Sequence, residues 1–170
     1  MAEDEKLWGK YGLLTVPAIV LAGTAIGLLS GSSGANSWYA GLHKPFFQPP
    51  PIAFPVVWTI LYALMGVALA MILVEPPSPR RKTALILFFV QLALNYAWSP
   101  IFFGAHDIGL ARIVIYAMAV VAALAAGNFL RLNRVAGLLL VPYLAWLIFA
   151  AVLNGAIQDM NPGAGTSLLG

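Results

Sequence analysis

The sequence predicts an all-α integral membrane protein, a bundle of five transmembrane helices with a long structured first loop. Hydrophobic residues make up 61% of the 170 residues and charged residues only 9%, and the mean hydropathy is +0.89. Soluble proteins carry roughly 25% charged residues, and a chain of this size buries only about 70% of its unfolded surface. The apolar remainder must face lipid, so we expect a single membrane domain over residues 1–170.

Five apolar segments alternate with ordinary stop signals along the chain. Each is close to the roughly 20 residues that a helix needs to cross about 30 Å of hydrocarbon. Three of the four linkers are short, so neighbouring helices should pack antiparallel. The predicted helices cover residues 11–30, 55–74, 83–104, 109–130 and 135–157, and the first loop covers residues 31–54.

The first predicted helix carries a repeated glycine spacing and ends at a Gly-Ser-Ser-Gly turn. Gly23, Gly27 and Gly31 form a tandem G-x-x-x-G ridge, which is a close-packing face for another helix. The partner helix could belong to this chain or to a second protomer. The apolar run that follows the N-terminal tail has no small-x-small cleavage site before a polar mature domain, so the first helix should remain in the mature protein.

The first loop is long for a bundle with short connections, and it is rich in proline and aromatic residues, including Trp38, Tyr39 and Phe46. A flexible tether would be polar and rich in Gly and Ser, whereas X-Pro units restrict the backbone and aromatic side chains seek burial or a ligand. We therefore expect the loop to fold as a lid. The alternative is an aromatic belt at the level of the lipid headgroups.

The second and third predicted helices each place aromatic or polar residues on one face. Trp58 and Tyr62 are four residues apart on the second helix, and the third carries Gln91, Asn95 and Trp98 at positions i, i+4 and i+7. Polar side chains are costly inside a membrane, so this stripe should point into the bundle. Asn95 could hydrogen-bond to neighbouring helices or face a ligand.

The fourth and fifth predicted helices are mainly aliphatic. Arg112, near the outer end of the fourth, is expected to reach the headgroups. Tyr143, Trp146 and Asn154 interrupt the fifth helix. The second helix starts at the end where the third and fifth finish, so the polar and aromatic residues of all three should gather beneath the first loop. Aromatic walls with a few amides indicate a pocket for a flat, largely apolar ligand.

Three prolines lie inside predicted helices: Pro17, Pro100 and Pro142. A proline in a helix interior removes one backbone hydrogen bond and leaves a carbonyl that neighbouring groups must satisfy. We interpret all three as kinks that adjust packing.

The cations predict the orientation, because Lys and Arg are retained on the cytoplasmic side. Only Lys44 and Arg112 fall on the side of the first loop. We therefore predict the N-terminus inside, and the first loop and the C-terminus outside. The seven cations on the opposite side are Lys6, Lys10, Arg80, Arg81, Lys82, Arg131 and Arg134.

Several function classes are excluded or unsupported. There is no Cys, which rules out disulfides, thiolate catalysis and Cys-ligated zinc. His43 and His106 are isolated, so we expect no metal site and no required cofactor. The scattered cations form no basic face, so we expect no nucleic acid partner. No catalytic triad, carboxylate pair or phosphate loop indicates a conventional enzyme.

An ordered set of motifs spans most of the chain. They are Trp38-Tyr39, Leu42-His43-Lys44-Pro45, Pro49-Pro50, Phe54-Pro55, Trp58-Thr59, Leu61-Tyr62, Gln91-Leu92, Leu94-Asn95, Trp98, Phe102-Phe103-Gly104, Pro142-Tyr143-Leu144, Trp146 and Leu153-Asn154. This set resembles the signature of the TspO/MBR family of tryptophan-rich sensory and translocator proteins.

The resemblance implies a membrane receptor or carrier that senses, sequesters or transports tetrapyrroles. Members are usually dimeric and bind porphyrins such as protoporphyrin IX, and eukaryotic relatives also bind cholesterol and benzodiazepine-type drugs. The first loop roofs the pocket, and this protein should form a homodimer with porphyrin as its ligand. Together with the helix faces, the resemblance gives the predicted ligand-binding residues Trp38, Tyr39, Phe46, Trp58, Tyr62, Asn95, Trp98, Tyr143, Trp146 and Asn154.

Two alternatives to a receptor or carrier follow from the same features. Some bacterial relatives degrade porphyrins with light and oxygen through two tryptophans, which match Trp38 and Trp146 here. A regulatory protein that docks membrane partners through its glycine ridge is the second alternative.

The chain also departs from the family pattern at two places. Phe46 stands where bacterial members often have Trp, which keeps stacking but removes an indole N–H. Gly155 and Asp159 follow Leu153-Asn154 where the animal cholesterol motif needs Tyr and then Arg. We therefore expect no high-affinity sterol binding through that motif.

Overall fold

The computed structural model describes residues 2–32 and 36–165, and all regular secondary structure in these ranges is helical. Five helical segments are long and apolar enough to cross a membrane, which confirms the predicted all-α membrane bundle. Residues 33–35 of the predicted first loop lie outside the description, as do residues 1 and 166–170. The helices are α1 (Ala2–Leu29), α2 (Ser37–Gly41), α3 (Ala53–Val74), α4 (Pro79–Ser99), the π-helix η1 (Pro100–Gly104), α5 (Ile108–Leu132), α6 (Arg134–Leu138) and α7 (Val141–Met160).

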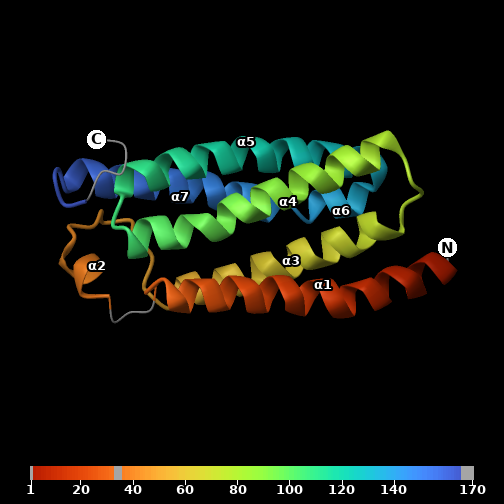
Figure 1. Cartoon of the computed structure of the whole chain (residues 1–170), viewed down its shortest axis with the longest axis horizontal. Coiled ribbons are helices and arrows are strands. Elements are labelled where there is room, and N and C mark those ends of the chain that lie inside the picture. The colour runs from red at the N-terminus through yellow and green to blue at the C-terminus, as the bar shows by residue number, and fades with distance from the viewer. Residues whose placement is uncertain (1, 33–35, 166–170) are drawn as a thin grey trace.

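The long helices lie side by side along one axis (Figure 1), and most of their boundaries are close to the predicted ones. The first helix is an exception, because α1 begins at Ala2 and not at residue 11. Hydropathy marks only the apolar run, whereas Ala, Glu and Lys continue a helix readily beyond it. The fifth predicted helix is divided into α6 and α7 by a turn at residues 139–140.

The three interior prolines behave differently from one another. Pro17 lies inside α1 as predicted. Pro100 begins the π-helix, and the N–H of Ala105 donates to the Pro100 carbonyl at 2.8 Å, a spacing of five residues. The helix predicted over residues 135–157 is interrupted at residues 139–140, just before Pro142, so the chain has a break there and not a kink within a continuous helix. Pro142 lies in the first turn of α7, where its missing N–H leaves no bond within α7 unmade.

Helices α1 and α3 pack with their backbones in close contact. A Cβ atom at Gly66 of α3 would lie 2.6 Å from the Cα of Val16, and the Thr15 hydroxyl donates to the Gly66 carbonyl at 2.8 Å. On α1, Gly23 leaves the space that the ring of Tyr62 fills. One glycine of the predicted ridge therefore packs within the chain, against α3. The homodimer stays a prediction.

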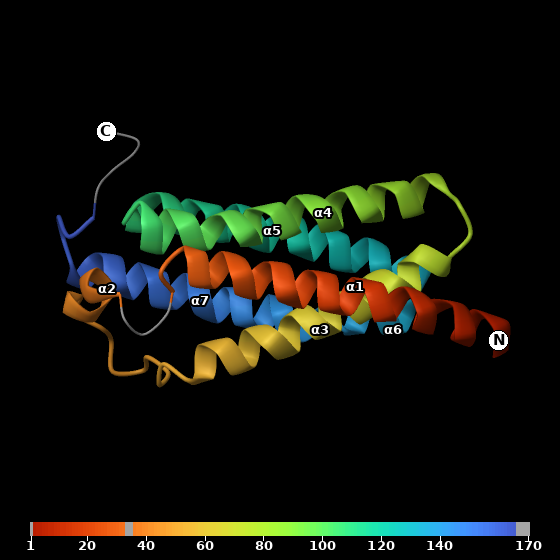
Figure 2. The ribbon, with the colours of Figure 1, turned by 60° about the horizontal axis from the view of Figure 1, so that its bottom comes forward.

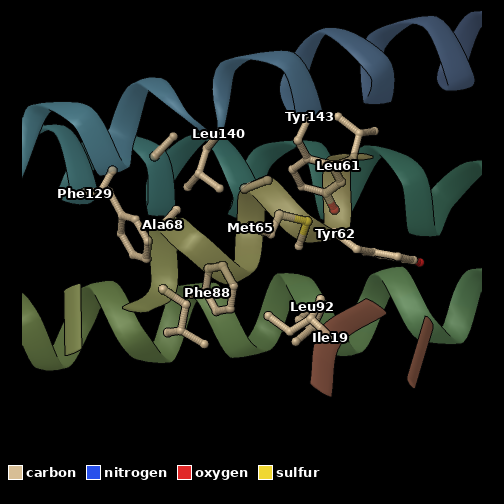
Figure 3. Packing of buried hydrophobic residues seen from close by; sticks show 14 of the residues in the cluster. Ile19, Leu61, Tyr62, Met65, Ala68, Phe88, Leu92, Phe129, Leu140 and Tyr143 are labelled. Atoms are coloured by element: carbon tan, nitrogen blue, oxygen red, sulfur yellow. The ribbon is translucent and has the colours of Figure 1, made fainter. Parts of the chain in front are cut away.

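The aliphatic core fills the bundle below the aromatic residues of the first loop. Met65, Phe88 and Phe129 are fully buried in it (Figure 3), and so is Leu147. The rings of Phe88 and Phe129 stack with centroids 5.6 Å apart and join α4 to α5. Dense packing of this kind leaves little free volume around the buried side chains.

The two ends of the bundle differ in chemistry. The N-terminus and the α3–α4 and α5–α6 connections lie at one end, and α2 and the C-terminal segment lie at the other (Figures 1 and 2). At the end with the N-terminus, the guanidinium of Arg81 caps the C-terminus of α3. It donates to the carbonyls of Ile72 at 3.0 Å and Leu73 at 2.7 Å. The loops that carry most cations thus share one end, and their position on the cytoplasmic side stays a prediction.

Candidate ligand-binding site

Residues 36–54, which we call the lid segment, fold across the end of the bundle opposite the N-terminus (Figure 1). Asn36 begins this segment and caps α2, accepting from the N–H of Tyr39 at 3.0 Å. The Asn36 amide also donates to the carbonyls of Gly31 at 3.1 Å and Phe103 at 3.5 Å. A single capping side chain therefore ties the start of the lid segment to α1 and to the π-helix.

Within the described ranges, the ring contacts at this end fall into two groups. We call them the upper and the central aromatic group. The upper group contains Trp38, Tyr39, Trp98, Phe102, Phe103 and His106. The central group contains Phe46, Phe47, Phe54, Trp58, Tyr62, Tyr96, Tyr143, Trp146 and Phe149.

The upper aromatic group joins the lid segment to the end of α4. Trp98 stacks on Phe102 with centroids 4.9 Å apart, and Trp38 meets the edge of the same ring at 5.6 Å. The other side of Trp38 stacks on the imidazole of His106 at 4.3 Å. His106 has φ +58°, an uncommon conformation for a residue other than glycine, which places it in the turn before α5.

Tyr39, in the upper group, also has polar contacts within the lid segment. The Gln48 amide donates to its hydroxyl at 2.9 Å, and the ammonium of Lys44 lies 4.7 Å from the ring centroid. Burial raises the pKa of the Tyr39 phenol, and the hydrogen bond from Gln48 opposes this rise. The phenol therefore stays neutral at ordinary pH.

The central aromatic group lies between α3 and α7. Trp58 contacts Tyr62 at 5.2 Å between centroids, Tyr143 at 6.3 Å and Trp146 at 6.5 Å. The ring of Phe54 meets that of Trp146 at 6.0 Å. Helices α3 and α7 are not among the pairs whose backbones pack closely. Large rings therefore fill the space between these two helices.

A buried polar network closes the floor of the central group. The Tyr62 hydroxyl donates to Asn95 Oδ1 at 2.8 Å, and Asn95 Nδ2 donates to the Tyr143 hydroxyl at 3.1 Å. The Tyr143 hydroxyl donates in turn to Gln91 Oε1 at 2.7 Å. Each amide atom of Asn95 therefore has a partner, and the side chain connects α4 to α3 and α7. Of the two roles that the sequence allowed for Asn95, the structure shows the hydrogen bonds to neighbouring helices.

Asn154 of α7 is the opposite case. Only 2% of its surface is exposed, and within the described residues neither its Oδ1 nor its Nδ2 has a hydrogen-bond partner. The indole N–H of Trp98 is buried and unpaired as well. An unsatisfied buried amide costs about 1–3 kcal/mol, so a water molecule or a ligand that bonded to Asn154 would recover part of this cost.

Residues 15–159 match the TspO/MBR family. The chain belongs to this family. It is 39% identical over 154 residues to the tryptophan-rich protein TspO of Archaeoglobus fulgidus, covering 88% of this chain and 98% of the relative. It is 42% identical over 128 residues to the translocator protein of Sus scrofa, covering 74% and 76%. The tryptophan-rich sensory protein of Cereibacter sphaeroides is 36% identical over 126 residues, covering 74% and 78%.

The predicted site residues of this TspO/MBR chain do not form a single lining. Tyr62, Asn95 and Tyr143 meet in the polar network, next to Trp58 and Trp146. Trp38, Tyr39 and Trp98 belong to the upper group instead. Phe46 is fully exposed and touches only the ring of Phe47 among the described aromatic residues. Further aromatic members that the sequence analysis did not select are Phe47, Phe54, Tyr96, Phe102, Phe103, His106 and Phe149.

Most of these additional residues have a signal in the sequence. Phe102 and Phe103 belong to a family motif, and Phe47 and Phe54 belong to the aromatic loop. Phe149 lies three residues after Trp146 on α7, so helical spacing places it on a neighbouring part of the same face. His106 has no such signal, because its contact with Trp38 depends on the turn before α5.

The two tryptophans that the resemblance associates with porphyrin degradation, Trp38 and Trp146, lie in different groups. No ring contact in the described parts of the chain joins one group to the other. The residues described also bring no three His, Cys, Asp or Glu side chains together. The arrangement is therefore one of stacking surfaces and a few amides.

Replacing the two buried asparagines should have different effects on stability. Asn95→Leu removes the acceptor of Tyr62 and the donor to Tyr143, and should lower the free energy of unfolding by about 2 kcal/mol. Asn154→Leu breaks no hydrogen bond within the protein and should leave the stability unchanged or raise it. Unfolding midpoints of the purified variants in one detergent measure both effects. An equal loss in the two variants would contradict the difference in their pairing.

Proposed function

We propose that this TspO/MBR protein is a membrane receptor or carrier that binds porphyrins at the central aromatic group, beneath the lid segment. Its ligands would be protoporphyrin IX or haem-type tetrapyrroles, in tetrapyrrole sensing, sequestration or transport. The observation that carries the proposal is the cluster of large rings between α3 and α7, centred on Trp58 and Trp146, which meet edge to face. A flat apolar macrocycle is held best by ring faces and by burial of apolar area.

The helix packing supports a site at this position. Helices α1 and α3 are in backbone contact at Gly66, so no side-chain rearrangement can open a space between them. The space between α3 and α7 is filled by side chains, and these can change rotamer while both helices stay in place. A ligand could therefore replace ring–ring contacts with ring–ligand contacts of similar kind.

The polar groups support a ligand with a hydrogen-bonding edge. Asn95 is already committed to Tyr62 and Tyr143, whereas Asn154 has an unused donor and an unused acceptor. A tetrapyrrole carries carboxylate side chains at one edge of an otherwise apolar plane. We propose that Asn154 binds this polar edge and the tryptophans bind the plane.

The test is a titration of the purified protein with protoporphyrin IX in lipid nanodiscs, followed by the quenching of tryptophan fluorescence. We expect saturable quenching with one porphyrin per chain, and empty nanodiscs should show no saturation. Protein purified from cells that make excess porphyrin should also be coloured. Non-saturable quenching with a colourless preparation would contradict the proposal and favour lipid or protein binding.

A further inference from the structure

The C-terminal segment after α7 forms a tight turn, and both ends of this turn hydrogen-bond to the lid segment. We call residues 161–164, Asn-Pro-Gly-Ala, the latch turn. The Ala164 N–H donates to the Asn161 carbonyl at 3.1 Å, and Gly163 has φ +80°. These are the features of a type II turn, which favours Pro at its second position and Gly at its third. The turn is rigid because its own sequence determines its shape.

The first contact is between the side chain of Asn161 and the backbone of His43. The His43 N–H donates to Asn161 Oδ1 at 2.8 Å, and Asn161 Nδ2 donates to the His43 carbonyl at 2.8 Å. The second Nδ2 hydrogen goes to the carbonyl of Ile157 at 2.7 Å. Because the His43 N–H can only donate, the orientation of the amide is fixed. A carboxylate at this position could not donate to the His43 carbonyl.

The second contact is between the other end of the latch turn and Trp38. The indole N–H of Trp38 donates to the Ala164 carbonyl at 2.8 Å, while the Trp38 ring stacks on His106. The chain then passes over the α4–α5 connection. Gly165 makes this possible, since a Cβ atom there would lie 2.6 Å from the His106 carbonyl oxygen.

We propose that Asn161 is a positioning residue that holds the lid segment closed, so that the latch turn sets the rate at which ligand enters and leaves. The amide of Asn36 and the indole of Trp38 bond the start of the lid segment to the rest of the chain. Beyond these bonds the segment rests mainly on apolar and ring contacts, such as those of Leu42 and Tyr39 with the upper group. Apolar contacts are not directional, whereas the paired hydrogen bonds of Asn161 fix one position of the lid. The role in ligand exchange rests on the proposed porphyrin site.

The main experiment compares Asn161→Ala with wild type in nanodiscs. Loss of two hydrogen bonds should raise the association and dissociation rates of protoporphyrin IX together, each about tenfold, with the dissociation constant changing by less than about threefold. Backbone amide exchange of residues 38–43 in protein without porphyrin should also become about tenfold faster. Asn128→Ala is the matched control, because the Asn128 amide donates only to Leu124 within α5. It should match wild type in both measurements.

Asn161→Ala should release the lid segment, and a cross-link that holds the lid segment on the latch turn should have the opposite effect on porphyrin exchange. The chain has no Cys, so His43→Cys with Pro162→Cys introduces the only two thiols and leaves Asn161 and the His43 backbone in place. A short bifunctional maleimide between them should slow porphyrin exchange at least about tenfold. Unchanged exchange after cross-linking would overturn the latch, as would wild-type amide exchange in Asn161→Ala. If wild type binds no protoporphyrin IX, the proposed function fails, and amide exchange alone then decides whether Asn161 holds the lid segment.

Discussion

A Trp58→Ala, Trp146→Ala double variant should bind protoporphyrin IX about 100-fold more weakly than wild type. The two indoles belong to one ring group between α3 and α7, with centroids 6.5 Å apart and planes at 88°. Each offers a large apolar face, and removing one costs about 1.4 kcal/mol of binding, a factor of about ten. Because both changes remove stacking area rather than charge, the dissociation rate should account for most of the loss. Titration by fluorescence quenching and by porphyrin absorption gives the two dissociation constants.

The matched control for this double variant is Trp8→Ala. Helix α1 begins at the end of the bundle opposite α2 (Figure 2), and Trp8 is its seventh residue. Its removal deletes an indole from the same protein without touching the proposed site, so affinity should stay within about twofold of wild type. Equal affinity in the double variant and in Trp8→Ala would show that porphyrin, if it binds, binds elsewhere. Circular dichroism should show unchanged helix content in both variants.

Gly66→Ala should destabilise the bundle by about 2–3 kcal/mol. The added Cβ would lie 2.6 Å from the Cα and 2.9 Å from the backbone nitrogen of Val16, so a side chain cannot turn aside to accommodate it. Helix α1 must move away from α3, which also breaks the bond from Thr15 to the Gly66 carbonyl. Inserting a methyl group into a packed interface typically costs this much. The midpoint of thermal unfolding in a single detergent measures the effect.

Gly127→Ala is the control for that substitution, because both glycines lie inside transmembrane helices, away from the terminal turns. A Cβ atom at Gly127 of α5 would meet nothing within 4 Å. The substitution should therefore be neutral, or stabilising by at most about 1 kcal/mol through the better helix propensity of alanine. If both variants lose stability equally, the loss reflects glycine in a membrane helix in general and not the contact with Val16.

Transmembrane spans are the part of the fold that the sequence predicts best. A bilayer requires about 20 apolar residues per crossing whatever the neighbouring helices are, so composition alone locates each span. The same argument fails at polar ends. It placed the start of the first helix at residue 11, although α1 begins at Ala2. Hydropathy also runs without interruption through residues 139–140, where the structure has a turn just before Pro142.

Asn95 and Asn154 show where residue-level prediction reaches its limit. Both are amides in apolar helices, and the sequence assigns the two of them to one site. The structure pairs every amide atom of Asn95 and none of Asn154. Whether a buried amide is satisfied depends on which hydroxyl lies opposite it, and that follows from the register of α3 and α7 relative to α4. The spacing of residues within one helix contains no information on that register.

The sequence by itself determined the membrane bundle, the ends at which its loops gather and the aromatic character of the first loop, because these depend on composition and on local spacing. It did not separate Trp38 from Trp146, and it did not indicate that Asn161 would bond to the backbone of His43. Only the tertiary structure decided these contacts. The bonds between His43 and Asn161 join residues 118 positions apart, and the rings around Trp38 and Trp146 come from different helices. Such contacts depend on how whole helices are placed.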